Sequence, residues 1–570
     1  MTTKEWTRAA LAVFATLTAM RGAVAAERPD SRVRTLIDPV RVVATSERMD
    51  AAELCGPRHG QVSEGVFCVG SGPILKQGEW VLLDFGRELN GSVQIGCGAQ
   101  GGRNARARIC FGESVSEAMS ELGRKGACND HAIRDDVVSL PWLGRREIGE
   151  TGFRFVRIVN AGADALQLEY VRAVSLMRPM RRLGGFRSSD ARLNAVFDTA
   201  VRTVQLCCQD YLWDGIKRDR LVWMGDTHPE TMAILPVFGA ASVLPESLAY
   251  MAATTPIGHW MNGHHATYTL WWIRNLAEWY RYTGDLDGLK ANAAYLSRTF
   301  DQVAGAMKDG EWRGGNFLDW PTKHNDAAAT AGTQALALDT ARETEFLATA
   351  LKDEQLAEKA RALAAELGKL KPDPHGAKSA AALLALAGLR DPKEMFASVL
   401  GQNGHAGVST FYGYYMLEAM SAAGENQRAL DTVRDYWGAM LDMGATSFWE
   451  DFNLAWTNNA CRIDEMPVAG KKDVHGDYGD FCYIGYRHSL CHGWSSGPVA
   501  WCMAHILGIR PLGVGSRAFE VSPFLGDLDW AEGEYALPDG RVLKVSVRKN
   551  ADGSLKTDVV APDGVRVITK

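Results

Sequence analysis

The chain has 570 residues, of which 46% are hydrophobic and 23% are charged, and its formal net charge is −6. This composition is typical of a globular protein that is too long for one small core, so we expect two or three domains. The net negative charge and the lack of a long Lys/Arg run do not favour nucleic acid or an anionic membrane surface as a partner.

The first 26 residues have the order of a secretory signal peptide. Lys4 and Arg8 precede the apolar run AALAVFATLTAM, and small residues follow it up to Ala25 and Ala26. The apolar run is too short for a permanent membrane span. We therefore expect cleavage near Ala25 or Ala26 and a mature protein that is periplasmic or secreted.

Five of the eleven cysteines fall between Cys55 and Cys128. In an oxidising compartment, Cys55 with Cys68 or Cys97 with Cys110 are candidate disulfides. Buried free thiols are an equally good interpretation, because spacing alone does not fix disulfide geometry. The ligand spacing of a zinc site is absent, so we assign these cysteines no chemistry.

Residues 33–180 contain short β-branched and aromatic runs separated by Gly-containing turns, for example EWVLLDFGRELNGSVQIGC and TGFRFVRIVNAG. This rhythm predicts an antiparallel β-sandwich. From residue 186 to about 512, apolar residues recur at intervals of three and four, which predicts amphipathic helices. Residues 516–570 alternate again and contain Pro-Asp-Gly and Ala-Asp-Gly turns, which predicts a small C-terminal β-sandwich domain.

The expected fold is therefore multidomain. A β-sandwich over residues 33–180 and a C-terminal β domain over residues 516–570 flank an all-α body over residues 186–512. Roughly a dozen helices suit an (α/α)6 toroid, a double ring of inner and outer helices whose inner mouth is a natural cleft.

Three loops of the helical body place a carboxylate near a tryptophan. They are DGIKRDRLVWMGD at 214–226, GNFLDWPTKHND at 315–326 and GATSFWEDFNLAW at 444–456. In sugar-binding sites, an aromatic face packs on the C–H face of a pyranose and acids bind the sugar hydroxyls. An aromatic ring that shields a carboxyl group from water also raises the pKa of that carboxyl, which a general acid requires. The alternative is that each Trp belongs to the core and each acid is a cap or an ion-pair partner. That alternative weakens when three such loops occur in one body.

The same residues resemble the inverting α-L-rhamnosidases, a family of glycoside hydrolases. The family signature is an Asp, a short basic segment, an acid, and then Trp-x-Gly-Asp. Asp214, Arg218, Asp219, Trp223 and Asp226 stand at the matching places. The segment GATSFWEDF resembles the family's Thr-x-Trp-Glu segment, and HSLCHGWSSGPVAWCMAHILGI at 488–509 resembles its late His-containing helix. The resemblance covers the helical body and the C-terminal β domain.

The resemblance implies roles for single residues. Asp219 is the expected general acid and Glu450 the expected base that activates water. The remaining expected substrate-binding residues are Asp214, Arg218, Trp223, Asp226, Asp319, Trp320, Trp449 and His492.

The chain also departs from the family pattern. Gly215 and Ile216 replace the usual Cys-Pro, and Asp219 stands where Glu is more common. A shorter acid has to lie about one methylene closer to the substrate, so Glu230 is an alternative general acid. His228 is an alternative substrate contact, although a His before Pro is more often a structural hydrogen-bonder.

We expect no metal and no cofactor. His264 and His265 are adjacent and point in different directions, and no third ligand lies at helical spacing. One of the two is a candidate substrate contact instead. Together with the predicted signal peptide, the resemblance therefore implies an exported exo-glycoside hydrolase that releases terminal α-L-rhamnose or a related sugar from a carbohydrate substrate by inversion. The alternatives are a uronic-acid lyase or hydrolase on the same toroid, using Tyr268, His265 and Arg218, and a non-catalytic glycan-binding protein.

Overall fold

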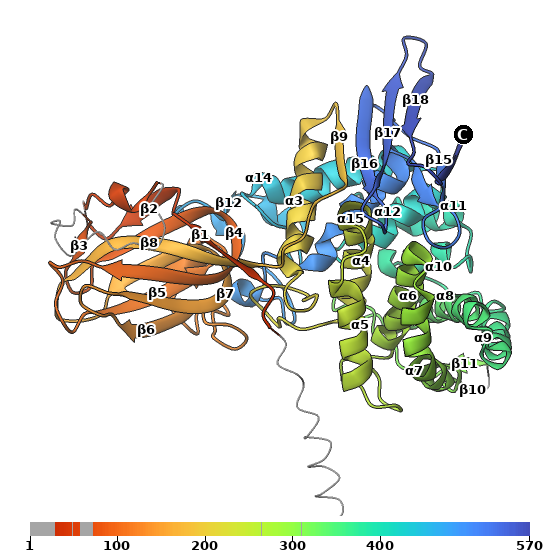
Figure 1. The fold of residues 1–570 in the computed structure, drawn as a ribbon, viewed down its shortest axis with the longest axis horizontal. Coiled ribbons are helices and arrows are strands. Elements are labelled where there is room, and N and C mark those ends of the chain that lie inside the picture. Colours follow the sequence, from red (N-terminus) through yellow and green to blue (C-terminus); the bar gives the residue numbers. More distant parts are fainter. Residues whose placement is uncertain (1–28, 48, 57–71, 264, 309) are drawn as a thin grey trace, which may run out of the picture.

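The computed structural model describes residues 29–47, 49–56, 72–263, 265–308 and 310–570. The predicted signal peptide, Cys68 and His264 lie outside these residues. Figure 1 shows a β domain at one end of the molecule, a helical body at the other, and the C-terminal strands packed against that body. None of the helices in the described part of the chain is both long and apolar enough to cross a membrane.

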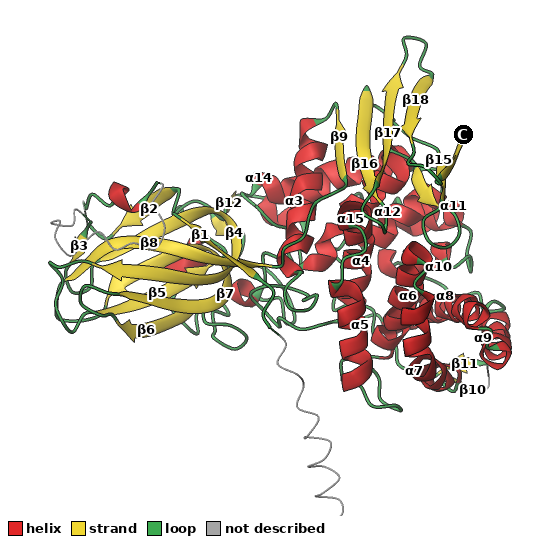
Figure 2. Cartoon of the chain, viewed as in Figure 1, coloured by secondary structure: helices red, strands yellow, loops and turns green. Residues whose placement is uncertain are grey.

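The N-terminal β domain is one eight-stranded, antiparallel sheet whose long strands bend (Figure 2). The strand path is β1-β8-β4-β7-β5-β6, with β2 paired to β4 and β3 to β8. The elements are β1 (Val33–Ile37), β2 (Arg41–Thr45), η1 (Ala52–Leu54), β3 (Ile74–Leu75), β4 (Trp80–Cys97), β5 (Arg106–Gly112), α2 (Val115–Met119), β6 (Asp135–Ser139), β7 (Arg145–Asn160) and β8 (Leu166–Met177).

The strand β4 explains how this sheet encloses a core. The first part of β4 pairs with β2 and its last part with β8, while β7 pairs with both parts. The β4–β7 register shifts between Asp84 and Leu89. The apolar side chains of β4, β5, β7 and β8 meet in one buried cluster that includes Leu83, Ile109 and Phe153. Cys97 and Cys110 are both buried free thiols, so the candidate disulfide between them is not formed.

The helical body follows. Its helices are α3 (Ala191–Cys207), α4 (Met224–Phe238), α5 (Val243–Thr254), α6 (Ala266–Thr283), α7 (Leu286–Ala304), α8 (Asp326–Leu351), α9 (Glu354–Leu367), α10 (Lys378–Leu386), α11 (Pro392–Met395), α12 (Gly413–Ala422), α13 (Asn426–Thr432), α14 (Gly438–Asp442) and α15 (Gly497–Trp501). One-turn segments are η2 (Phe396–Leu400), η3 (Val433–Trp437), η4 (Leu454–Thr457), η5 (Gly485–Arg487), η6 (Gly493–Ser496) and η7 (Cys502–Ile506).

The helices pack in a circuit. α4 packs on α6, α6 on α8, α8 on α10, α10 on α12, α12 on α15, and α15 returns to α4. The helix α4 is buried on nearly all sides, and its buried residues include the polar side chains Asp226, His228 and Glu230. By contrast, α7 and α9 bury one stripe and lie outside α8.

The body is not purely helical, because it also contains the short strand pairs β10 (Met307–Lys308) with β11 (Glu311–Trp312) and β12 (Ala460–Cys461) with β13 (Lys472–Asp473). The C-terminal strands form two small sheets. One has the order β14-β15-β19 and the other β18-β17-β16-β9. Their bounds are β9 (Gly185–Ser188), β14 (Ile509–Pro511), β15 (Ala518–Val521), β16 (Trp530–Ala536), β17 (Val542–Lys549), β18 (Leu555–Val560) and β19 (Arg566–Thr569). Because β9 precedes the first helix, the two ends of the body are joined through this sheet.

Candidate functional site

A pocket of about 180 Å³ lies among loops of the helical body. This volume is below the roughly 300–1,000 Å³ of pockets for drug-sized ligands, so the pocket suits one small ring. Its lining residues are Asp214, Arg218, Asp219, Trp223, Asp226, His265, Tyr268, Phe317, Trp320, Glu450, Cys482, Tyr483, Arg487, His492 and Trp494. Eight of the ten site residues predicted from sequence are among them.

The loop from Asp214 to Leu221, which joins α3 to α4, closes on itself. The Asp214 N–H donates to the Leu221 carbonyl at 3.0 Å, and the Leu221 N–H donates to Asp214 Oδ1 at 3.0 Å. Asp219 and Arg220 both have positive φ, at 55° and 57°. Consecutive non-glycine residues in this region are unusual and are found where the surroundings fix the backbone, often at functional sites.

Arg218 connects the two carboxylates that were predicted as acid and base. Its Nη1 donates to Asp219 Oδ1 at 3.3 Å, while its Nε donates to Glu450 Oε2 at 3.3 Å and its Nη2 to Glu450 Oε1. The Ser489 N–H also donates to Glu450 Oε2, at 3.1 Å. Glu450 is only 1% exposed, so these donors replace the water that would otherwise stabilise its negative charge.

The other two aspartates form a buried group with His492. The His492 Nε2 lies 3.0 Å from Asp226 Oδ1 and 3.9 Å from Asp214 Oδ2. Burial, followed by repulsion from Asp219 and Asp226, raises the pKa of Asp214 well above its usual value. Burial also raises the pKa of Asp226 well above normal and lowers that of His492 well below normal. Neutral carboxyls and a neutral imidazole can both donate to and accept from sugar hydroxyls.

Aromatic rings form much of the remaining pocket wall. Tyr268 packs edge-on against Trp223 with ring centroids 5.5 Å apart, and Phe317 packs edge-on against Trp320 at 5.4 Å. The indole of Trp494 lies near His492 and donates to the Glu450 carbonyl at 2.9 Å. A wall of this kind can cover the C–H face of a sugar ring.

The N-terminal β domain also reaches this site, which the sequence did not reveal. His131 Nδ1 lies 3.3 Å from Asp219 Oδ1. The neighbouring Asp130 binds the pocket residue Arg487 at 3.1 Å, and His131 Nε2 lies 3.2 Å from Arg487 Nη2. No local pattern marks His131 or Arg487, because each gains its place only from the packing of two domains.

Two predicted substrate-binding residues do not line the pocket. Asp319 is 5% exposed, and its Oδ1 accepts from the Thr322 N–H at 2.8 Å, so it caps a turn while the next residue, Trp320, faces the pocket. Trp449 is fully buried and packs against Phe452, while the next residue, Glu450, faces the pocket. This placement does not support direct substrate contact by Asp319 or Trp449.

The two alternative residues near the loop are also buried away from the pocket wall. Glu230 is 0% exposed, and burial raises its pKa well above normal. His228 is 2% exposed and its Nδ1 lies 2.8 Å from the Tyr415 hydroxyl, which is a structural contact. Of the two candidate acids, only Asp219 therefore lines the pocket.

Two buried groups bring carboxylates and a histidine close enough to hold a metal ion, Asp214–Asp226–His492 and Glu113–Glu117–His475. Sequence spacing did not show them, because in each group the histidine lies far from the two carboxylates in the chain. In the second group, the Lys217 ammonium lies 2.9 Å from Glu113 and 3.2 Å from Glu117 and supplies the positive charge.

Comparisons with known proteins show similarity in family and in fold. Residues 181–371 match the family model of the bacterial alpha-L-rhamnosidase 6 hairpin glycosidase domain. The structure is similar to a family GH78 rhamnosidase of Bacillus sp. GL1, with 21% identity and a TM-score of 0.73, covering 91% of this chain and 55% of that one. None of the curated proteins matches the chain.

Two further solved structures are similar and contain the sugar. The rhamnosidase from Klebsiella oxytoca with rhamnose bound has 21% identity and a TM-score of 0.63, covering 83% of this chain and 96% of that one. The Streptomyces avermitilis α-L-rhamnosidase complexed with L-rhamnose has 16% identity and a TM-score of 0.65, covering 86% and 48%. This chain thus spans about half the length of the Bacillus and Streptomyces proteins.

The family match and the shared fold define the class of this region as a six-hairpin glycosidase domain. Within that class, the resemblance to the α-L-rhamnosidases that the loop 214–226 indicated is confirmed.

Proposed function

We propose that the chain is an exported exo-glycoside hydrolase that releases terminal α-L-rhamnose, or a closely related sugar, from a glycan or glycoside. One observation carries this proposal. A single guanidinium, that of Arg218, contacts both Asp219 and Glu450 on the wall of a pocket sized for one sugar ring. The family match of residues 181–371 supports rhamnose as that sugar.

The proposed reaction is a single displacement with inversion. Asp219 donates its proton to the glycosidic oxygen as the bond to the anomeric carbon breaks, and Glu450 accepts a proton from the water that attacks the opposite face of the sugar. An inverting pair has to stand about 6.5–9.5 Å apart to hold both sugar and water, compared with about 5 Å for a retaining pair. Arg218 and the Ser489 N–H both donate to Glu450 Oε2 and thereby orient the carboxyl group for this role.

Asp214, Asp226 and His492 are proposed to bind the sugar hydroxyls. The Nδ1 atom of His492 is buried, has no hydrogen-bond partner among the described residues and lies 4.0 Å from Glu450 Oε1. Tyr268 donates to Asp226 at 3.4 Å and orients that carboxyl. The rings of Trp223, Trp320 and their neighbours are proposed to enclose the apolar edge of the sugar.

The proposed architecture is an (α/α)6 toroid with an N-terminal and a C-terminal β-sandwich domain. The circuit from α4 through α15 and back supports an inner ring of helices, and the buried surface of α4 supports its inner position. The proposed export rests on the order of residues 1–26. Mass spectrometry of the protein isolated from its host tests it, since an N-terminus that still includes those residues would contradict export.

The lyase alternative is not favoured. It would require Tyr268 or His265 as a base near an anionic sugar. Burial, followed by Asp226, raises the pKa of the Tyr268 phenol well above its usual value, which makes it a poor base. A non-catalytic binding protein would not need the Asp219–Arg218–Glu450 arrangement.

A panel of aryl glycosides tests the proposed function. The mature protein should release the aryl group from an α-L-rhamnoside and show little activity on the other sugars. The products should lack the enone absorbance that a lyase would create. Binding of rhamnose without turnover of any member of the panel would instead favour a glycan-binding protein.

A further inference from the structure

We propose that Glu113 of the N-terminal β domain is a positioning residue for both candidate catalytic loops, through Lys217 on one side and the Ser489–Leu490 segment on the other. This inference rests on the proposed function for its catalytic consequence. It makes the β domain a part of the active-site structure rather than an appended module.

The first link runs to the loop of the candidate acid. Glu113 follows β5, Glu117 lies in α2, and both are 0% exposed. Lys217 Nζ reaches from the loop of the helical body to Glu113 Oε2 at 2.9 Å and to Glu117 Oε1 at 3.2 Å. Because Lys217 is two residues before Asp219, this ion pair fixes the loop from which Asp219 projects.

The second link runs to the candidate base. Glu113 Oε2 accepts from the Leu490 N–H at 2.6 Å, and its Oε1 accepts from the Ser489 hydroxyl at 3.4 Å. The Ser489 N–H donates to Glu450 Oε2 at 3.1 Å, and the Glu450 N–H donates to the Ser489 carbonyl at 2.9 Å. One buried carboxylate thus holds the segment that in turn holds Glu450.

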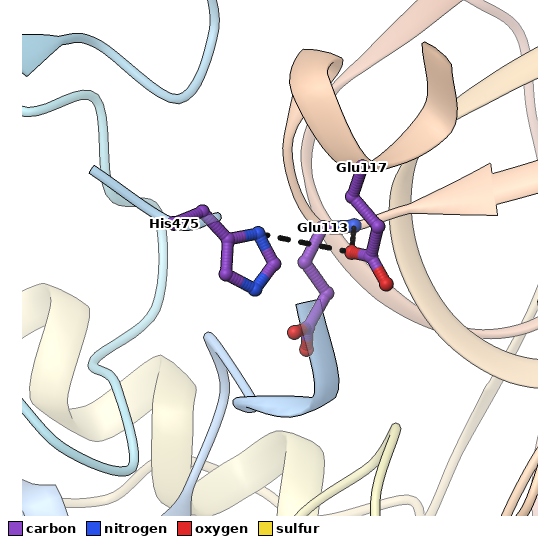
Figure 3. A group of neighbouring side chains, drawn as sticks. All are labelled: Glu113, Glu117 and His475. Atoms are coloured by element: carbon purple, nitrogen blue, oxygen red, sulfur yellow. Dashed lines mark hydrogen bonds and ion pairs between the residues drawn. The ribbon is translucent and has the colours of Figure 1, made fainter. Parts of the chain in front are cut away.

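Further contacts join the same two loops. Lys217 Nζ also donates to the carbonyls of Tyr486 at 3.0 Å and His488 at 2.6 Å. His475 lies beside Glu113 and Glu117 in Figure 3, with its Nδ1 3.9 Å from Glu117 Oε2, and its Nε2 lies 3.0 Å from the His488 carbonyl. The network spans the β domain, the 214–221 loop and the 485–492 segment, with both glutamates fully buried and the Lys217 side chain 11% exposed.

The backbones of the two domains also meet closely here. Gly152 of β7 lies against Ile216 and Lys217, and a Cβ added at Gly152 would lie 2.9 Å from the backbone nitrogen of Lys217. This approach leaves no room for the loop to relax toward the β domain. A change in the Glu113–Lys217 pair is therefore expected to move the catalytic groups rather than be absorbed locally.

The test uses the full mature chain with Glu113→Gln and Lys217→Met, and with Val115→Ala as a matched control. Val115 is a buried neighbour on α2 that packs against Leu82, Ala118 and Phe155 and lies outside the polar network. We expect the two network variants to lose roughly 100-fold in kcat with little change in KM, because misplacement of catalytic groups by about 1 Å has this effect. The conservative variant Lys217→Arg should retain more activity than Lys217→Met, and Val115→Ala should lower the melting temperature while keeping kcat.

Hydrogen–deuterium exchange supplies a readout that does not depend on activity. Peptides covering 217–221 and 488–492 should exchange faster in Glu113→Gln than in wild type, and those covering α6 and α8 should not change. If the wild-type protein cleaves no glycoside, the proposed function fails while this measurement still decides the positioning role. Wild-type kcat and exchange in both network variants would overturn the inference, as would an equal loss of kcat in Val115→Ala.

If Glu113→Gln does not fold, Ser489→Ala takes its place. It removes the hydroxyl that donates to Glu113 Oε1 and that also contacts the Cys491 backbone. A loss of kcat in Ser489→Ala together with Lys217→Met would support the inference. Wild-type kcat in both would overturn it.

Discussion

Glu450→Gln is predicted to abolish most activity, because it removes the proposed base while keeping the size of the side chain. General acid–base catalysis contributes about 10²–10⁴-fold, so the barrier should rise by roughly 3–5 kcal/mol. The loss should appear in kcat even with an activated aryl leaving group, since water activation is needed for every substrate of an inverting enzyme.

The same change also perturbs stability. Glu450 is 1% exposed and paired with Arg218, and breaking a buried ion pair costs about 3–5 kcal/mol when one charge is left alone. Here the cost should be smaller, because Arg218 keeps its contact with Asp219 and a Gln oxygen can still accept from the Ser489 N–H. The variant should therefore fold, with a lowered melting temperature.

Steady-state kinetics with an aryl α-L-rhamnoside, with circular dichroism to confirm folding, is the assay. Asp451→Asn is the matched control, because this neighbouring acid is partly buried in the same segment, caps the Phe452 N–H and does not line the pocket. Near-wild-type kcat is expected for the control. A folded Glu450→Gln enzyme with near-wild-type kcat, or a control that is equally impaired, would refute the assignment of the base.

Three further predictions concern the other acids. Asp219→Asn should slow poor leaving groups by about 10²–10⁴-fold and activated aryl groups much less, and an equal loss for both would argue against a general acid. The pKa of Asp214 is raised in the folded protein, so the protonated form of this residue favours folding. Its contribution to the free energy of unfolding is complete below the unfolded-state pKa of about 4 and is lost as pH rises through the folded-state pKa. Between pH 5 and pH 8, the melting temperature of the wild-type protein should therefore fall more than that of Asp214→Asn. Parallel curves of melting temperature against pH would contradict this. Chelator treatment should leave the rate nearly unchanged, and a large loss restored by one divalent ion would show that Asp214, Asp226 and His492 hold a metal.

Asp214, Arg218, Asp219 and Glu450 line one pocket, as their short contiguous motifs suggested, and their catalytic and binding roles stay predictions. Two neighbours of those motifs do not line that pocket. Trp449 and Asp319 were selected for their proximity in sequence, but adjacent residues of an extended segment face opposite ways, so Glu450 and Trp320 line the pocket and the other two are buried.

Other site residues carried no local signal. Tyr483, Arg487 and Trp494 come from irregular segments without helical periodicity, and His131 comes from the other domain. The periodicity of residues 186–512 predicted a helical body, but it gave no sign that β9 pairs with β16 across more than three hundred residues. Long-range pairing of this kind depends on the assembled fold and not on any single segment.

The stereochemistry of the first-released sugar tests the central claim most directly. The mature enzyme and an aryl α-L-rhamnoside are followed by time-resolved proton NMR before the anomers of free rhamnose equilibrate. A single-displacement reaction by Asp219 and Glu450 predicts that β-L-rhamnose appears first and the α anomer later. Initial release of the α anomer, or no release of rhamnose, would contradict it.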